Sequence, residues 1–185
     1  MIIWINGPFG GGKSTTADLL HHALPGSILF DPEDVGSLLR GCVPADHPKR
    51  HKDFQDYPMW RPLVAETAVH LDRYVDPHPV IAPMTLLHPH YAKEIFDAIH
   101  AAGVELRHLL LHADPGVLTA RIDSSIEFPD DENRSEKVRA FRRLKTAAYR
   151  EAYQTWLPNN AEVIDTTILT PREVADQALK LIRLP

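Results

Sequence analysis

The chain has one cysteine, no long apolar run and no large excess of charge of either sign. The lone Cys42 cannot form a disulfide within the chain, which is typical of a reducing compartment. No apolar run approaches the roughly 20 residues that cross a bilayer, and the start lacks the basic and apolar segments of a secretory signal. The net charge of −5 offers no broad attraction for nucleic acid. These absences predict a cytoplasmic protein and argue against membrane contact and a nucleic-acid partner.

Short, β-branched apolar runs alternate with helical patterns along the chain. Hydrophobic residues make up 44% and charged residues 24% of the 185 residues, an ordinary balance for a single globular domain over residues 1–185. Alternating strands and helices build parallel sheets covered on both faces, so we expect an α/β fold with a five-stranded parallel sheet. Strands are expected at residues 2–5, 27–30, 79–84, 105–112 and 162–164, and helices at 13–23, 35–40, 60–75, 88–102, 115–123, 135–156 and 171–184.

A glycine-rich run, GPFGGGKST, separates the first strand from the first helix and fits the pattern GxxxxGK[ST]. Glycines let backbone N–H groups surround phosphate oxygens, and the following helix adds its positive end. Lys13 supplies a mobile charge and Ser14 a hydroxyl ligand for Mg²⁺. An ordinary glycine-rich turn is the alternative, which the flanking strand and helix disfavour. We therefore expect ATP and Mg²⁺ as cofactors, with the nucleotide held by Gly7, Pro8, Phe9, Gly10, Gly11, Gly12, Lys13, Ser14 and Thr15.

Nucleotide binding alone does not separate a switch, a motor and a transferase. A GTPase would carry an NKxD motif, which is absent. A motor or AAA-type ATPase would normally carry an acidic residue at the end of a following strand, and VIAPMTLLHP at residues 80–89 has none. Together with the short chain, this favours a kinase of small molecules.

Three acidic residues follow the second expected strand. In a parallel sheet that strand ends beside the phosphate loop, where the ligand crevice lies. Asp31, Glu33 and Asp34 are therefore placed to contact substrate, and Asp31 or Glu33 to accept the proton of a substrate hydroxyl. Asp31 is also placed to hold Mg²⁺ through water. The alternative is that Asp31 or Asp34 only caps the next helix.

Arginines gather between residues 121 and 143. Phosphoryl transfer spreads negative charge over oxygens, and an arginine-rich segment that closes over the site can neutralise it. Residues 121–140 resemble such a lid, with Arg121 and Arg134 as the expected catalytic arginines and Arg121 also touching the nucleotide. Arg139, Arg142 and Arg143 follow on the next helix. A solvated helix face with paired charges is the alternative for each of them.

Four stretches together resemble the bacterial tunicamycin-resistance proteins. They are the start MIIWINGPFGGGK, then FDPEDVG followed by LLR, then DFQDYPMWR at residues 53–61, and APMTLLHP at residues 82–89. The resemblance is dense over the first half and thin after Gly103. That family binds ATP through a P-loop and is similar in fold to small-molecule and nucleotide kinases, including shikimate kinase and the chloramphenicol phosphotransferase. The resemblance thus implies the three-layer, nucleoside monophosphate kinase-like P-loop fold with a lid. The resemblance implies resistance to a uracil-containing nucleoside antibiotic.

The stretch DFQDYPMWR is the most family-specific piece and suits a nucleoside. Aromatic side chains can stack on a base, an amide can read its edge and an arginine can meet an anionic or polar group. The alternative is that Tyr57 and Trp60 anchor the loop to the core. The expected substrate-binding residues, mostly within residues 31–75, are Asp31, Glu33, Asp34, Arg40, Phe54, Gln55, Tyr57, Trp60, Arg61, Thr85 and His88.

The leading hypothesis is an ATP- and Mg²⁺-dependent phosphotransferase that acts on a hydroxyl of a nucleoside-type small molecule, with tunicamycin suspected. One alternative is binding and sequestration of the antibiotic with ATP but without chemistry. Another is a metabolic kinase of a nucleotide or a shikimate-like acid. The sequence leaves open the acceptor hydroxyl, the choice between Asp31 and Glu33 as base, and whether the protein is a monomer or a homodimer.

Overall fold

A computed structural model describes residues 1–182, which form one parallel sheet with helices on both faces. The strand order is β2-β3-β1-β4-β5, so β1 lies in the middle and pairs with β3 on one side and β4 on the other. The fold expected from the alternating pattern is therefore confirmed. The strands are β1 (Ile2–Asn6), β2 (Ile28–Leu29), β3 (Val80–Pro83), β4 (Leu106–His112) and β5 (Glu162–Asp165).

The helices lie close to their expected positions. They are α1 (Lys13–Ala23), α2 (Pro32–Cys42), α3 (Trp60–Val75), α4 (Pro89–Ala101), α5 (Pro115–Asp123), α6 (Glu132–Thr155) and α7 (Pro171–Ile182), with short 3₁₀ turns η1 (Phe54–Asp56) and η2 (Leu157–Asn159). Helix α2 begins earlier than expected because Asp31 caps it and Pro32 suits its first turn. Helix α6 begins at Glu132 because Asp131 caps it. Residues 183–184 of the last expected helix lie outside the described part.

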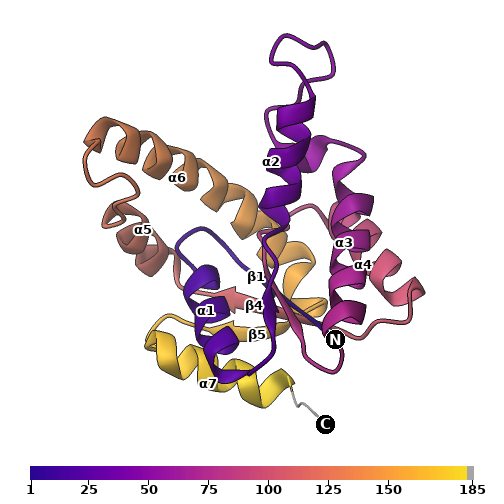
Figure 1. The fold of residues 1–185 in the computed structure, drawn as a ribbon. Coiled ribbons are helices and arrows are strands. Elements are labelled where there is room, and N and C mark those ends of the chain that lie inside the picture. The colour runs from indigo at the N-terminus through magenta and orange to yellow at the C-terminus, as the bar shows by residue number, and fades with distance from the viewer. Residues whose placement is uncertain (183–185) are drawn as a thin grey trace.

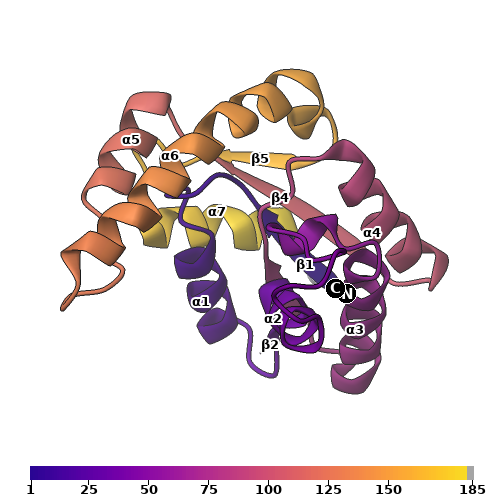
Figure 2. The same ribbon diagram turned by 90° about the horizontal axis from the view of Figure 1, so that it is seen from above.

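Side chains of each strand alternate between two covered faces. Ile3 and Ile5 of β1 pack in one cluster with α1 and α7, whereas Ile2 and Trp4 pack in another with α3 and α4. Helices α3 and α4 lie side by side in both views, and α1 and α7 lie together on the opposite side of the sheet (Figures 1 and 2). A fully buried strand of this kind explains the continuous apolar run at the start of the chain.

Helix α6 connects the lid region to the sheet. Its C-terminal half packs on the core through Tyr149 and Ala152, while α5 and the first half of α6 project beyond the sheet, across from α2 (Figure 1). The carboxyl ends of β1, β2 and β3 lead into the phosphate loop, α2 and the segment before α4, so these parts surround one end of the sheet. Within residues 1–182, no helix combines the length and apolar character needed to span a membrane.

Candidate active site

The phosphate loop joins β1 to α1 in a conformation that requires glycine. Gly10 and Gly12 have φ angles of 77° and 93°, which side chains disfavour. Gly12 stands at the N-cap of α1 without a side chain to cap it, and the first turn of the helix has no acidic residue. The amino end of α1 is therefore open to an anion, and the residues here fit the phosphates of a nucleotide.

Lys13 lies folded back inside this loop. Its Nζ donates to the carbonyl oxygens of Gly7 at 3.1 Å and Pro8 at 2.9 Å. Burial lowers the pKa of the Lys13 ammonium to about 8, while the negative charge of Glu33 opposes this shift and the positive charge of Arg142 adds to it. The ammonium thus lies within the field of one acid from α2 and one arginine from α6.

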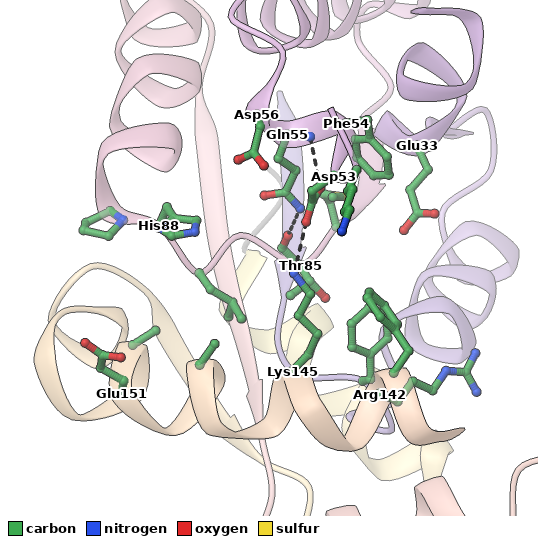
Figure 3. Close-up of a pocket in the computed structure, with 18 of the residues that line it drawn as sticks. Glu33, Asp53, Phe54, Gln55, Asp56, Thr85, His88, Arg142, Lys145 and Glu151 are labelled. Carbon is green, nitrogen blue, oxygen red and sulfur yellow. Dashed lines mark hydrogen bonds and ion pairs between the residues drawn. The ribbon is translucent and has the colours of Figure 1, made fainter. Parts of the chain in front are cut away.

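A cavity of about 650 Å³ opens beside the phosphate loop. Figure 3 shows it between α6 on one side and the η1 segment on the other, with Glu33 and Arg142 toward one end and His88 and Glu151 toward the other. Its polar and charged lining residues are Glu33, Arg40, Lys52, Asp53, Gln55, Asp56, Thr85, His88, Arg142, Lys145, Glu151 and Thr155. Its apolar lining residues are Phe9, Phe54, Met84, Leu87, Pro89, Val138, Phe141, Ala148, Ala152 and Trp156.

Only one of the three acidic residues that follow β2 lines the cavity. Glu33 lines the cavity, whereas Asp31 and Asp34 do not. The Oδ1 atom of Asp31 accepts from the backbone N–H of Glu33 at 2.8 Å and so caps α2. The pKa of the Glu33 carboxyl is raised, first by loss of solvent and then by the charge of Asp31, while Lys13 opposes the shift. Loss of solvent also raises the pKa of Asp31.

Among the lid arginines, Arg121 and Arg142 approach the phosphate loop and Arg134 does not. Arg121 donates to the carbonyl oxygen of Thr166 at 2.7 Å and to that of Gly10 at 3.5 Å. Arg142 lines the cavity, with its Cζ 6.0 Å from the centroid of the Phe9 ring. By contrast, the Cζ of Arg134 lies 3.7 Å from the Phe128 ring centroid, away from the cavity lining. Arg134, expected as a catalytic arginine, therefore does not line the cavity, whereas Arg142 does, with its guanidinium paired with Glu127 at 2.7 Å.

Two aromatic residues of DFQDYPMWR support the site instead of lining it. Tyr57 is 2% exposed and Trp60 is fully buried. Trp60 Nε1 donates to the carbonyl oxygen of Pro32 at 3.1 Å, which ties α3 to the start of α2. Their burial supports the alternative interpretation, in which both side chains anchor the loop to the core instead of stacking on substrate. Phe54 does line the cavity and packs on Trp60 with ring centroids 5.3 Å apart.

Arg61 is also occupied by the protein. It is buried, pairs with the Glu94 carboxylate and donates to the carbonyl oxygen of Gln55 at 2.7 Å. Its guanidinium also lies over the Tyr91 ring, 4.3 Å from the centroid. These contacts occupy Nε and Nη1, and Arg61 does not line the cavity, so the structure supports a structural role for Arg61 in place of the expected contact with substrate.

The remaining expected substrate residues gather at the cavity. Gln55 Nε2 donates to the carbonyl oxygen of Thr85 at 3.0 Å, and Thr85 Oγ1 donates to that of Gly7 at 2.8 Å. This chain of contacts links the η1 turn to the phosphate loop. Arg40 lies with its Cζ 5.3 Å from the Phe54 ring centroid, and His88 closes the far end (Figure 3).

Sequence reasoning named Arg142 but missed the rest of the cavity wall that α6 forms beyond residue 140. Lys145, Ala148, Ala152 and Thr155 lie three or four residues apart and line one side of the cavity. This stripe of small and polar side chains is the signal that could have identified the helix as a cavity wall. Lys52 and Asp53 were missed as well, on the connection before η1.

The residues present also fit Mg²⁺. The described residues 1–182 contain no group of three or more His, Cys, Asp or Glu side chains that could hold a metal ion. Mg²⁺ beside nucleotides needs only one or two protein ligands, because phosphate oxygens and waters complete its shell. The exposed hydroxyl of Ser14 in the first turn of α1 is available for this. Asp31, the other expected metal residue, caps α2 through Oδ1 and does not line the cavity.

Known proteins share this architecture. A tunicamycin resistance protein from Deinococcus radiodurans is 29% identical, with a TM-score of 0.71, over 100% of this chain and 96% of that one. A gluconokinase from Sinorhizobium meliloti (16% identity, TM-score 0.62, 98% and 91% covered) and a shikimate kinase from Acinetobacter baumannii (20%, 0.54, 98% and 92%) share the fold. No curated protein sequence matches the chain significantly. The resemblance to tunicamycin-resistance proteins noted from the sequence is confirmed.

A family described as an AAA domain matches residues 2–137. Membership of this family does not require an acidic residue after Pro83, which this chain lacks. The sheet order, the phosphate loop and the kinase neighbours agree with this match. The chain therefore belongs to the AAA-domain family and has the fold of P-loop small-molecule kinases.

Proposed function

We propose that the protein is an ATP- and Mg²⁺-dependent phosphotransferase that acts on a hydroxyl of a nucleoside-type small molecule, with tunicamycin as the candidate substrate. One observation carries this proposal: the Glu33 carboxylate lines the same cavity as Phe9 of the phosphate loop and lies within the field of Lys13. A carboxylate at one end of a cavity large enough for a small molecule thus interacts electrostatically with the lysine of the phosphate loop.

Each charged group near the phosphate loop has a role in this reaction. The substrate hydroxyl gives its proton to Glu33 as its oxygen bonds to the γ-phosphorus of ATP, and the bond to the leaving ADP breaks. Lys13 and Arg142 stabilise the charge that spreads over the transferred group. Mg²⁺, when bound with Ser14 as a ligand, supplies further charge neutralisation. Arg121, held by Thr166, orients the loop through Gly10.

The cavity favours an uncharged acceptor over an acidic metabolite. Its acidic residues are Glu33, Asp53, Asp56 and Glu151, and its basic residues are Arg40, Lys52, Arg142 and Lys145, so the two signs are balanced. The arginine expected to meet an anion, Arg61, is held by Glu94. The apolar wall near Trp156 and the Phe54 ring suit a ligand that carries a base or another apolar group beside its hydroxyls.

Tunicamycin is the suggested acceptor because a neighbour at 29% identity is a tunicamycin resistance protein. Sequestration of the drug with ATP is the second candidate function. The apolar wall of the cavity suits drug binding with or without phosphoryl transfer. The two differ at Glu33, because sequestration does not require a proton acceptor at that position.

The test measures ADP release from ATP and Mg²⁺ with a panel of acceptors: tunicamycin, uridine, shikimate and gluconate. We expect release with an uncharged nucleoside-type acceptor, lost in Lys13→Met. Release with only the two acids would establish a metabolic kinase. No release from any acceptor, together with saturable ATP-dependent binding of tunicamycin, would contradict transfer and support sequestration.

A further inference from the structure

The side chain of Asn6, the last residue of β1, is fully buried and uses every hydrogen-bonding position of its amide. Its Oδ1 accepts from the backbone N–H groups of Gly7 at 2.8 Å and Leu86 at 2.9 Å. Its Nδ2 donates to the Leu86 carbonyl oxygen at 3.0 Å and lies 3.2 Å from Nε2 of His108. Neither Asn6 nor His108 lines the cavity, so the proposed chemistry gives them no direct part.

The backbone partners reveal the orientation of the Asn6 amide and the position of the ring proton of His108. The N–H groups of Gly7 and Leu86 can only donate, so the atom facing His108 is the donor Nδ2. Nε2 of His108 must therefore accept, which places the ring proton on Nδ1, 2.7 Å from the carbonyl oxygen of Asn160. Burial agrees with a neutral ring, since it lowers the pKa of His108 to about 4.

The Asn6 amide joins the nucleotide loop to the acceptor side of the cavity. Gly7 is the first residue of the loop, and its carbonyl oxygen accepts from Lys13 Nζ and Thr85 Oγ1. Leu86 follows Thr85, which lines the cavity. Two hydrogen bonds hold the Leu86 backbone to Asn6. Any rotation of the amide would therefore move the loop relative to the acceptor-binding segment.

We propose that Asn6 and His108 are positioning residues, in which neutral His108 holds the Asn6 amide in the one orientation that fixes the phosphate loop against the segment carrying Thr85. This rests on the proposed function only in that the loop binds ATP and the segment binds the acceptor. Small misplacements of reacting groups cost up to about 10²-fold in rate, so a buried clamp at this junction affects catalysis without touching substrate.

Two matched substitutions of His108 separate positioning from packing. The terminal oxygen of His108→Gln can reach the place of Nε2 and accept from Asn6, whereas His108→Asn can replace only Nδ1 and donate to Asn160. Both remove the buried ring beside Phe96 and should lower the melting temperature. We expect the ATP dissociation constant to stay within about twofold in His108→Gln and to rise about tenfold in His108→Asn. Equal constants in the two variants would overturn the proposal.

The imidazole itself gives a readout that needs no activity measurement. The ¹⁵N shifts of His108 in the ligand-free protein should show the proton on Nδ1 at neutral pH. In Asn6→Asp the carboxylate faces Nε2, so the ring should become doubly protonated at the same pH. A wild-type ring with its proton on Nε2 would overturn the clamp. If the shifts agree but no acceptor is phosphorylated, the clamp stands and the proposed function fails.

Discussion

Lys145 of α6 and Asp53 before η1 form an ion pair with Nζ and Oδ2 3.1 Å apart, although 92 residues separate them in the chain. Both line the cavity, so the pair fastens the wall formed by α6 to the loop that presents Phe54 and Gln55 (Figure 3). Each side chain is about a third exposed, and exposed pairs contribute little to stability. The contact therefore shapes the cavity more than it stabilises the fold.

Lys145→Met tests this contact. We expect the KM for the acceptor to rise several-fold, because the wall and the loop are no longer joined, while the free energy of unfolding changes by less than ~1 kcal/mol. Steady-state kinetics and urea denaturation measure the two quantities. Lys137→Met, at an exposed position of the same helix that does not line the cavity, is the control. An acceptor KM that does not change in Lys145→Met would contradict the role of the pair.

Arg142 and Arg134 offer a direct comparison between two lid arginines. Arg142 pairs with Glu127 at 2.7 Å in this structure. In the proposed reaction its charge acts on the transferred group, so we expect Arg142→Ala to lower kcat about 10²-fold. Arg134→Ala should change kcat less than about twofold, since its guanidinium packs on Phe128. Single-turnover measurements with saturating ATP check both values. Comparable losses in the two variants would mean that the lid closes in a way that brings Arg134 to the phosphates.

The low pKa of Lys13 predicts proton uptake on nucleotide binding. Below pH 8 the ammonium is already charged in the free protein, so binding needs no proton at Lys13. Above pH 8 it is largely neutral, and phosphate oxygens favour the charged form. ATP affinity should therefore fall as pH rises through 8. Calorimetry in buffers of different ionisation enthalpy measures the uptake, which Lys13→Arg should abolish because guanidinium stays charged. Equal uptake in the arginine variant would assign the proton to another group.

Trp60 and Phe54 should differ in what their loss changes. Trp60→Phe leaves the carbonyl oxygen of Pro32 without its donor and opens space in the core, so the free energy of unfolding should fall by ~1–3 kcal/mol with the acceptor KM unchanged. Phe54→Leu should raise the acceptor KM, because its ring lines the cavity. Urea denaturation and kinetics on both variants separate the two roles. A changed KM in Trp60→Phe alone would restore the stacking interpretation.

The phosphate loop could be predicted from the sequence because its chemistry resides in consecutive residues. Glycines, Lys13 and the start of a helix make an anion site wherever a strand precedes them. The sheet followed from the same local patterns, with short apolar runs such as residues 2–5 buried on both faces. The largest shifts, at the starts of α2 and α6, occurred where the caps Asp31 and Asp131 decided them, and other boundaries moved by one or two residues.

The acceptor side could be predicted only in part, because it depends on contacts between distant segments. Asp31 and Glu33 were visible in the sequence as candidate bases. The sequence did not show that Asp31 caps α2 and that only Glu33 lines the cavity. An aromatic residue in a loop suits a ligand and a core equally, so Tyr57 and Trp60 remained ambiguous until their burial was known. The partner of Arg61, Glu94, lies 33 residues away.

The mass of tunicamycin after incubation with ATP and Mg²⁺ tests the central claim most directly, in wild type, Glu33→Gln and Asp31→Asn. Asn caps a helix about as well as Asp, so Asp31→Asn should keep α2 intact and serve as the matched control. We predict that the drug gains one phosphoryl group with wild type and Asp31→Asn but not with Glu33→Gln, which should still bind ATP. Unchanged drug with all three proteins, or full transfer by Glu33→Gln, would contradict phosphorylation by Glu33 at this cavity.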